Sequence, residues 1–390
     1  MLEKKKISAN SIVLFCLIGV YYCLNAKYLN FSLFIIMRWV FPALLVGIAV
    51  WQNNGRIVAP PWLMIWFSVA VLVPSIVGAD ATTSIIKYIS WVLIFYGSYI
   101  YFYQNQEREA MHRSLEILCF ILVFFQIANV IFTLAENSAV NGRSTGMTTN
   151  ANTLGIYSNL AFWAGVFFYT RTINKTTKLI WLGFCLTTAY TAIASGSRTA
   201  FLVMALNFMA FLFLLQSKRK HILLFAASLT LLIYLVLSGK LNFLGITAVE
   251  RLSEEGGAER AELWDFALNL WQNNKLFGVG YTISSRYNEL VGLAFHNSYI
   301  SYLVECGIWG VVLFAPSLVY VLFKCFSHSK RQHLEFYIAC MMLVVLLIAA
   351  WSESFMFAVG STEGFTFWFL LAWAMVYIKG TEKKISSALQ

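Results

Sequence analysis

Twelve long apolar segments, separated by polar stretches, dominate the pattern of hydrophobic and polar positions along the chain. A helix needs roughly 20 apolar residues to cross the hydrocarbon core of a bilayer, and each segment is near that length. The pattern predicts an all-α polytopic membrane protein with about 12 transmembrane helices, formed by residues 1–390 as a single integral membrane domain. The predicted spans are residues 10–26, 28–50, 59–78, 83–103, 114–135, 151–170, 179–195, 199–216, 222–238, 297–323, 335–355 and 364–379.

The basic residues predict the orientation of these spans. Cytoplasmic loops of membrane proteins carry an excess of Lys and Arg. With a cytoplasmic N-terminus, every segment on that side holds basic residues, so we expect an inner-membrane protein with both termini in the cytoplasm. These residues are Lys4, Lys5, Lys6, Arg56, Arg108, Arg113, Arg171, Lys175, Lys178, Lys218, Arg219, Lys220, Lys324, Lys330, Arg331, Lys379, Lys383 and Lys384.

The composition excludes several classes of protein. Hydrophobic residues make up 59% of the chain and charged residues only 12%, against about a quarter in soluble domains. The net charge of +10 lies in short loops, where it orients helices, so we expect membrane lipids and not nucleic acid as partners. The seven cysteines lie in or beside apolar segments without a C-x-x-C pair, which predicts neither disulfides nor a zinc site. No small-residue cleavage site follows the first apolar run, so we expect a retained first helix.

One connection is much longer than the others. Residues 239–295 form a large predicted periplasmic loop between the ninth and tenth spans, and a loop of this length is usually functional or a lid. Its apolar residues Leu263, Phe266, Ala267, Leu270 and Trp271 have helical spacing. This spacing predicts a helix that lies in the membrane interface.

Several arginines on the predicted periplasmic side suggest an anion site. Arg143 precedes the sixth span, Ser197-Arg198 opens the eighth, and the long loop holds Arg251 and Arg260. A guanidinium stays charged and binds phosphate oxygens two at a time. Anchoring of helices at lipid headgroups is the alternative for each arginine. For Arg198 we favour function, because its turn is too short to leave the helix bundle.

His296 is the only histidine on that side, and it stands with Asn297 where the long loop meets the tenth span. A lone histidine is more often structural than catalytic, so both roles stay open at this point. We expect no metal site, because the periplasmic segments show no D-x-D motif and no histidine pair at ligand spacing.

In these features the chain resembles the superfamily of O-antigen ligases and O-antigen polymerases, which are bacterial membrane glycosyltransferases. The resemblance covers residues 140–310. It rests on the twelve-span plan, the long loop and four motifs in order, and each motif alone is weak. The motifs are Arg143 with Gly146 and Asn152; Ser197-Arg198; Arg260 in Gly257-Ala258-Glu259-Arg260; and His296-Asn297 with Gly307 and Gly310.

The resemblance implies an all-helical, GT-C-like architecture and transfer of a glycan from undecaprenyl pyrophosphate on the periplasmic face. Such transfer inverts the anomeric carbon and uses neither a metal nor another cofactor. The acceptor is the lipid A core in ligases and a second lipid-linked glycan in O-antigen or exopolysaccharide polymerases. The matching positions imply that His296 acts on the acceptor hydroxyl. They imply that Arg198 and Arg260 hold the pyrophosphate, with Arg143 and Arg251 as helpers and Asn152, Ser197 and Asn297 in support.

Two other classes remain as alternatives. A twelve-helix secondary transporter would have related halves and broken helices that meet at the membrane midplane. Here the long loop lies off-centre, and the polar motifs gather on one face. A purely structural membrane protein would not need arginines at several periplasmic helix ends. Within the superfamily, the spacing after His296 favours a ligase over a polymerase only weakly.

Overall fold

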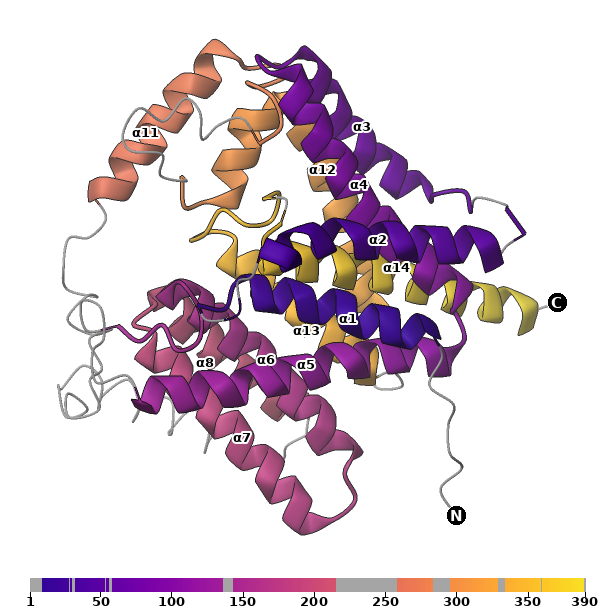
Figure 1. Ribbon diagram of the computed structural model, residues 1–390, viewed down its shortest axis with the longest axis vertical. Helices are drawn as coiled ribbons and strands as arrows, with labels where there is room; N and C mark the ends of the chain where they lie inside the picture. Colours follow the sequence, from indigo (N-terminus) through magenta and orange to yellow (C-terminus); the bar gives the residue numbers. More distant parts are fainter. Residues whose placement is uncertain are drawn as a thin grey trace.

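The structure is a computed structural model, and all its regular elements in the described part of the chain are helices (Figure 1). The structure describes residues 9–27, 29, 32–52, 54–55, 58–135, 143–214, 258–282, 295–328, 334–358 and 360–388. The helices are α1 (Ala9–Leu24), α2 (Ser32–Gln52), α3 (Trp62–Val77), α4 (Ala81–Gln104), α5 (Arg108–Ala135), α6 (Ala151–Arg171), α7 (Lys175–Ala194), α8 (Arg198–Leu214), α11 (Ala258–Asn273), α12 (Ser298–His328), α13 (Leu334–Ala349) and α14 (Thr362–Ala388).

The predicted apolar segments coincide with these helices, except for the ninth. That segment, residues 222–238, lies outside the described residues, as does most of the long loop. Among the described helices, α2, α4, α5, α7 and α12 are long and apolar enough to cross a membrane, and four shorter apolar helices accompany them. The all-helical prediction is confirmed. The count of twelve spans and the GT-C-like architecture stay predictions.

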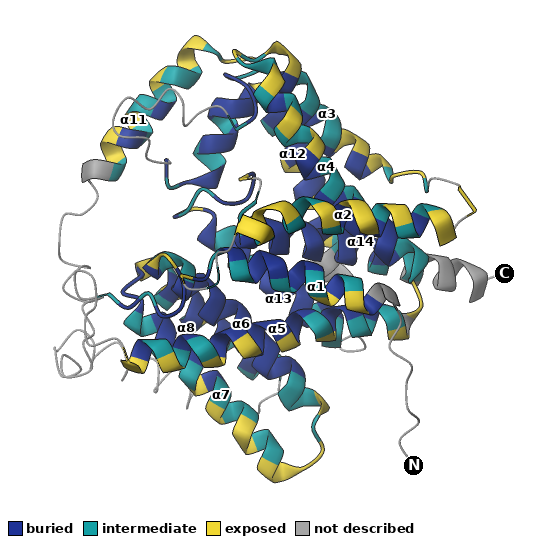
Figure 2. Ribbon diagram, in the orientation of Figure 1, coloured by how far each residue is buried: buried dark blue, intermediate teal, exposed yellow. Residues whose placement is uncertain are grey.

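The helices form a bundle around α6, α13 and α14, which are buried over most of their described lengths. Figure 2 shows exposed positions along α2, at the outside of this bundle. Many of these positions are apolar, among them Leu33, Ile35 and Ile36. A soluble protein would not expose such a row of large apolar side chains, whereas lipid would cover it. The exposed face of α2 therefore fits contact with a membrane.

Helix α12 is interrupted at Gly307, whose backbone has φ 63° and ψ −166°. The chain that follows α11 lies against this interruption. The amides of Ile308 and Val279 donate to the carbonyls of Lys275 and Val304, each at 2.9 Å. Backbone amides and carbonyls that lose their helical partners at the interruption thereby form hydrogen bonds, as buried backbone groups require. The end of the long loop is thus fixed to α12.

The predicted interfacial helix is present as α11. Its residue Ala267 is fully buried and packs with Phe295, Val304 and Val279 in a small core beside the main one. The indole of Trp264 donates to the carbonyl oxygen of Phe295 at 2.9 Å. Because Phe295 directly precedes His296, α11 contacts the chain next to the predicted catalytic histidine. Its location in a membrane interface stays a prediction.

Candidate functional site

The start of α12 presents His296 in an unusual backbone conformation. His296 has φ 49°, in the left-handed region that non-glycine residues rarely adopt. The next residue, Asn297, caps the helix: its side-chain oxygen accepts from the amides of Tyr299 and Ile300 at 2.9 and 3.1 Å. The capping bonds of Asn297 therefore fix the chain directly after the histidine.

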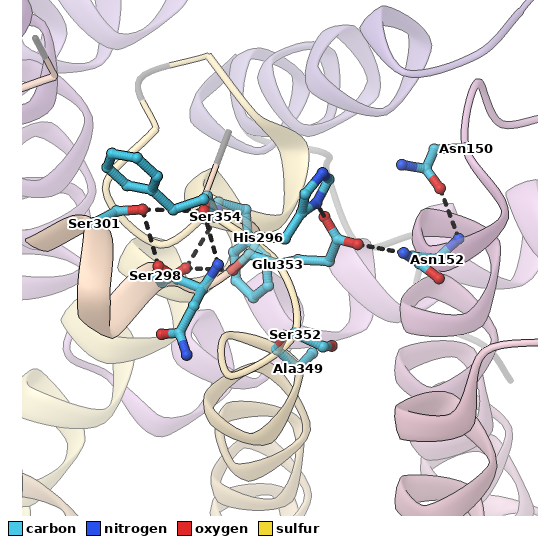
Figure 3. Close-up of polar contacts among 12 residues, drawn as sticks. Asn150, Asn152, His296, Ser298, Ser301, Ala349, Ser352, Glu353 and Ser354 are labelled. Carbon is cyan, nitrogen blue, oxygen red and sulfur yellow. Dashed lines mark hydrogen bonds and ion pairs between the residues drawn. The ribbon is translucent and has the colours of Figure 1, made fainter. Parts of the chain in front are cut away.

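The His296 imidazole faces a carboxylate. Nδ1 of His296 lies 3.3 Å from Oε2 of Glu353, in the loop between α13 and α14 (Figure 3). The two side chains are 30% and 15% exposed, so the pair is largely shielded yet reachable from one side. A carboxylate accepts hydrogen bonds, so we assign the proton to Nδ1. This leaves Nε2 with a lone pair that can accept a proton.

Glu353 connects His296 to two further predicted residues. The side-chain amide of Asn152, at the start of α6, donates to Oε1 of Glu353. The carbonyl oxygen of the same amide accepts from Nη2 of Arg143, and Nε of Arg143 donates to the carbonyl of Ser195 at 2.9 Å. We call Arg143, Asn152, Glu353 and His296 the polar chain. It joins segments that are far apart in the sequence.

The backbone around Glu353 is fastened to the start of α12. The Ser298 hydroxyl donates to the carbonyl of Glu353 at 2.6 Å and accepts from the amide of Phe355 at 3.1 Å. The hydroxyl of Ser354 accepts from the amide of Asn297 at 3.0 Å. These bonds attach the backbone of Glu353 and of the two residues after it to the start of α12, and so keep the carboxylate near His296.

A pocket adjoins the polar chain. It lies where the starts of α6 and α8 face the end of α13, and Figure 3 shows Asn152, Ser352 and Ala349 around this region. Its polar lining includes Asn152, Asn159, Ser197, Thr199 and Ser352. Hydroxyl and amide groups of this kind bind sugar hydroxyls or phosphate oxygens through hydrogen bonds. Two residues predicted in support, Asn152 and Ser197, thus line one pocket.

Arg198 begins α8 and is exposed. The turn before it is tight: Gly196 has φ 60°, and a Cβ there would lie 2.9 Å from Cγ of Arg143. The buried Ser197 accepts from the amide of Ala200 at 3.4 Å through its hydroxyl. Arg143 therefore packs directly on the turn that carries Arg198, and it links this turn to the polar chain.

Of the two arginines predicted in the long loop, the structure describes only Arg260. Arg260 is half-buried in the first turn of α11, four residues before Trp264 and therefore on the same side of the helix. Trp264 contacts Phe295, next to His296, so this side of α11 faces the start of α12. Arg260 is not part of the polar chain. Arg251 lies outside the described residues.

Two carboxylates were missed by the sequence analysis. Glu353 lies inside the predicted span 335–355, where it was counted as part of an apolar run. Glu363 precedes the predicted span 364–379, is buried, and accepts from the side-chain amide of Asn25 at 3.2 Å. Burial raises the pKa of Glu363 above its usual range. The sequence signal that could have identified both residues is an acidic residue at the end of a predicted span, where charge is costly.

The described residues include no group of three or more His, Cys, Asp or Glu side chains that could hold a metal ion. The expectation that the reaction needs no metal was made from the sequence motifs and the family resemblance. It stays a prediction.

Comparison with known families bears on the same region. Residues 183–315 match the family model described as O-antigen ligase. This part of the chain is similar to O-antigen ligases, which supports a place in the O-antigen ligase superfamily. The resemblance inferred from the motifs is thereby confirmed, and the apolar helices agree with a membrane protein of this family. Members are membrane glycosyltransferase-like enzymes of the ligase or polymerase type.

The match to O-antigen ligases runs from α7 to the middle of α12 and includes Arg198, Arg251, Arg260 and His296. It does not include Arg143, Asn152 or Glu353, which the structure brings to the matched region from outside. No curated protein matches the chain.

Proposed function

We propose that this chain is an O-antigen ligase-type enzyme, which moves a glycan from undecaprenyl pyrophosphate to the lipid A core on the periplasmic face. The observation that carries the proposal is the oriented imidazole of His296, within the matched O-antigen ligase region and next to a polar pocket. A histidine whose Nδ1 is held by a carboxylate has Nε2 available as a base.

The proposed reaction is an inverting transfer in one displacement. The acceptor hydroxyl loses its proton to Nε2 of His296 while its oxygen attacks the anomeric carbon of the donor glycan. The bond between that carbon and the pyrophosphate oxygen breaks, and undecaprenyl pyrophosphate leaves with the electron pair. Negative charge therefore grows on the leaving group. Arg198 and Arg260 are the proposed cations that stabilise it, with no metal or other cofactor.

Arg143 has a different proposed role from Arg198. Two of its guanidinium nitrogens already bind groups of the protein, the carbonyl of Ser195 and the side chain of Asn152. Their geometry supports a role in holding the turn before Arg198, in place of the direct pyrophosphate contact that the resemblance implied. Arg251 remains a proposed helper at the pyrophosphate.

Deletion of the gene in its bacterium tests the proposal. Without a ligase, lipopolysaccharide should consist of bare core, and lipid-linked polymer should accumulate in the inner membrane. Gel electrophoresis of lipopolysaccharide and extraction of lipid-linked glycans measure both quantities. Core capped with a single repeat unit would instead identify a polymerase, which joins lipid-linked glycans. An unchanged glycan profile would contradict both activities.

A further inference from the structure

Glu353 makes a separate contact with each of its two carboxylate oxygens. Oε2 lies 3.3 Å from Nδ1 of His296, and Oε1 accepts from the side-chain amide of Asn152. The side chain is only 15% exposed, so little water competes for these contacts. A buried carboxylate needs such partners, because unpaired burial of its charge is costly.

We propose that Glu353 is a positioning residue for glycan transfer, which holds His296 with Nε2 directed to the acceptor hydroxyl and couples it to Asn152 and Arg143. This inference rests on the proposed function. Glu353 acts through His296 and does not itself contact the reacting atoms.

The side-chain amide of Asn152 connects Arg143 to Glu353 in one defined orientation. Its nitrogen can only donate and its oxygen can only accept, so it can face a carboxylate on one side and a guanidinium on the other in one orientation only. The structure has this orientation, with Nδ2 toward Glu353 and Oδ1 toward Arg143. A rotated amide would present its oxygen to the carboxylate. Arg143 therefore fixes Asn152, Asn152 fixes Glu353, and Glu353 fixes the imidazole.

The movement of the proton during the reaction also supports a positioning role for Glu353. When Nε2 of His296 takes the acceptor's proton, the imidazole becomes an imidazolium, and Nδ1–H continues to donate to Oε2 of Glu353. The new positive charge then lies beside an existing negative charge, which stabilises it as the transfer proceeds. No proton needs to pass to Glu353, so both of its contacts persist through the reaction.

The backbone conformation of His296 supports the inference that its side chain is held in a fixed orientation. Its left-handed conformation, φ 49°, costs free energy for a residue other than glycine, so the surrounding contacts must maintain it. Those contacts are the capped start of α12 and the bonds between Ser298 and the Glu353 segment. The same contacts therefore hold both His296 and Glu353. A general base that is preorganised for proton transfer needs such fixed neighbours.

The test measures kcat and the donor KM of the purified full-length protein, with an undecaprenyl pyrophosphate-linked glycan as donor. Glu353→Gln should lower kcat about tenfold to a hundredfold, since a general base contributes roughly 10²–10⁴-fold and its orientation is part of that contribution. The donor KM should stay within about twofold, because the carboxylate does not bind the pyrophosphate. Glu353→Asp should recover part of kcat, because it keeps the charge.

Glu262→Gln is the matched control. Glu262 is an exposed carboxylate on α11, and the same chemical change there should leave kcat unchanged. Size-exclusion chromatography in detergent reports whether each variant is folded. If Glu353→Gln does not fold, Asn152→Ala takes its place, since it leaves the carboxylate present but unsupported, and it should lower kcat.

Three outcomes would overturn the proposal. An unchanged kcat in Glu353→Gln would remove any role in positioning. A raised donor KM with normal kcat would make Glu353 a donor-binding residue. A Glu353→Gln variant that transfers less than His296→Ala would place the carboxylate closer to the chemistry than the histidine. If His296→Ala itself transfers normally, the proposed function fails as well, so the two failures are distinguishable.

Discussion

His296 and Arg198 have complementary tasks in the proposed transfer, because one receives a proton and the other meets developing negative charge. Their surroundings differ accordingly. His296 is held at a defined angle by Glu353, whereas Arg198 is exposed at the start of α8. An exposed guanidinium can reach a large, charged lipid headgroup as it enters. The turn below Arg198 is fixed by Arg143, so its reach is limited to one region.

Arg198→Ala should reduce transfer at least about a hundredfold, because removal of one donor that stabilises transition-state charge typically costs 10²–10³-fold. Arg198→Lys should recover little, because an ammonium cannot form the paired contact of a guanidinium with phosphate. Transfer of labelled glycan in membranes measures both variants, with the amount of membrane-inserted protein as control. Normal transfer by Arg198→Ala would contradict the assignment of this residue to the pyrophosphate.

Some site residues could be predicted from sequence, and others could not. Arg143 and His296 could be predicted from their places at predicted periplasmic helix ends, and Asn152 from the family resemblance; the structure brings the three together. Glu353 lies 57 positions after His296. Hydropathy assigned it to the end of a span. Only the docking of its loop on the start of α12 shows the contact, and this tertiary arrangement leaves no periodic pattern in the sequence.

At the element scale, the interrupted helix α12 determines where the end of the long loop lies. The interruption lets residues 275–280 bind the backbone on both sides of Gly307, which holds α11 near the start of α12. The helix α11 itself was predicted from its apolar spacing, and its existence is confirmed. The interruption was not predicted, because a glycine in an apolar run is also common in continuous helices.

Gly307→Ala should destabilise the fold by about 1–3 kcal/mol, because its backbone region is accessible almost only to glycine. A Cβ at this position would also lie 2.4 Å from the carbonyl oxygen of Leu276. Thermal unfolding in detergent measures the loss. Gly183→Ala in α7 is the matched control, since no atom lies within 4 Å of its added Cβ. Equal unfolding temperatures for the two variants would show that the interruption bears no strain.

At the scale of the whole molecule, the distribution of polar groups defines two faces. The polar chain, the pocket and the start of α11 lie at helix ends that the basic-residue pattern assigns to the periplasm. Hydropathy sufficed to predict the helices. The common periplasmic side, which rests on the basic residues, stays a prediction. Neither pattern could predict the packing, because side chains of the same apolar kind are exposed on α2 and buried on α6.

Reporter fusions test the sidedness. Alkaline phosphatase, which is active only in the periplasm, should be inactive when fused after Lys220 and active when inserted near Gly256. Both positions lie outside the described residues, so the expectation rests on the distribution of basic residues alone. The same reading at both positions would contradict the predicted topology and the periplasmic assignment of His296.

The most direct measurement is glycan transfer by the purified protein in lipid vesicles, with an undecaprenyl pyrophosphate-linked glycan as donor and lipid A core as acceptor. The wild-type protein should form glycosylated core and release undecaprenyl pyrophosphate in equal amounts, also in the presence of a chelator. His296→Ala should lower both products together by about 10²–10⁴-fold. Transfer by His296→Ala at the wild-type rate would contradict the proposed mechanism. The absence of transfer by the wild-type protein to either lipid A core or a second lipid-linked glycan would contradict the proposed function.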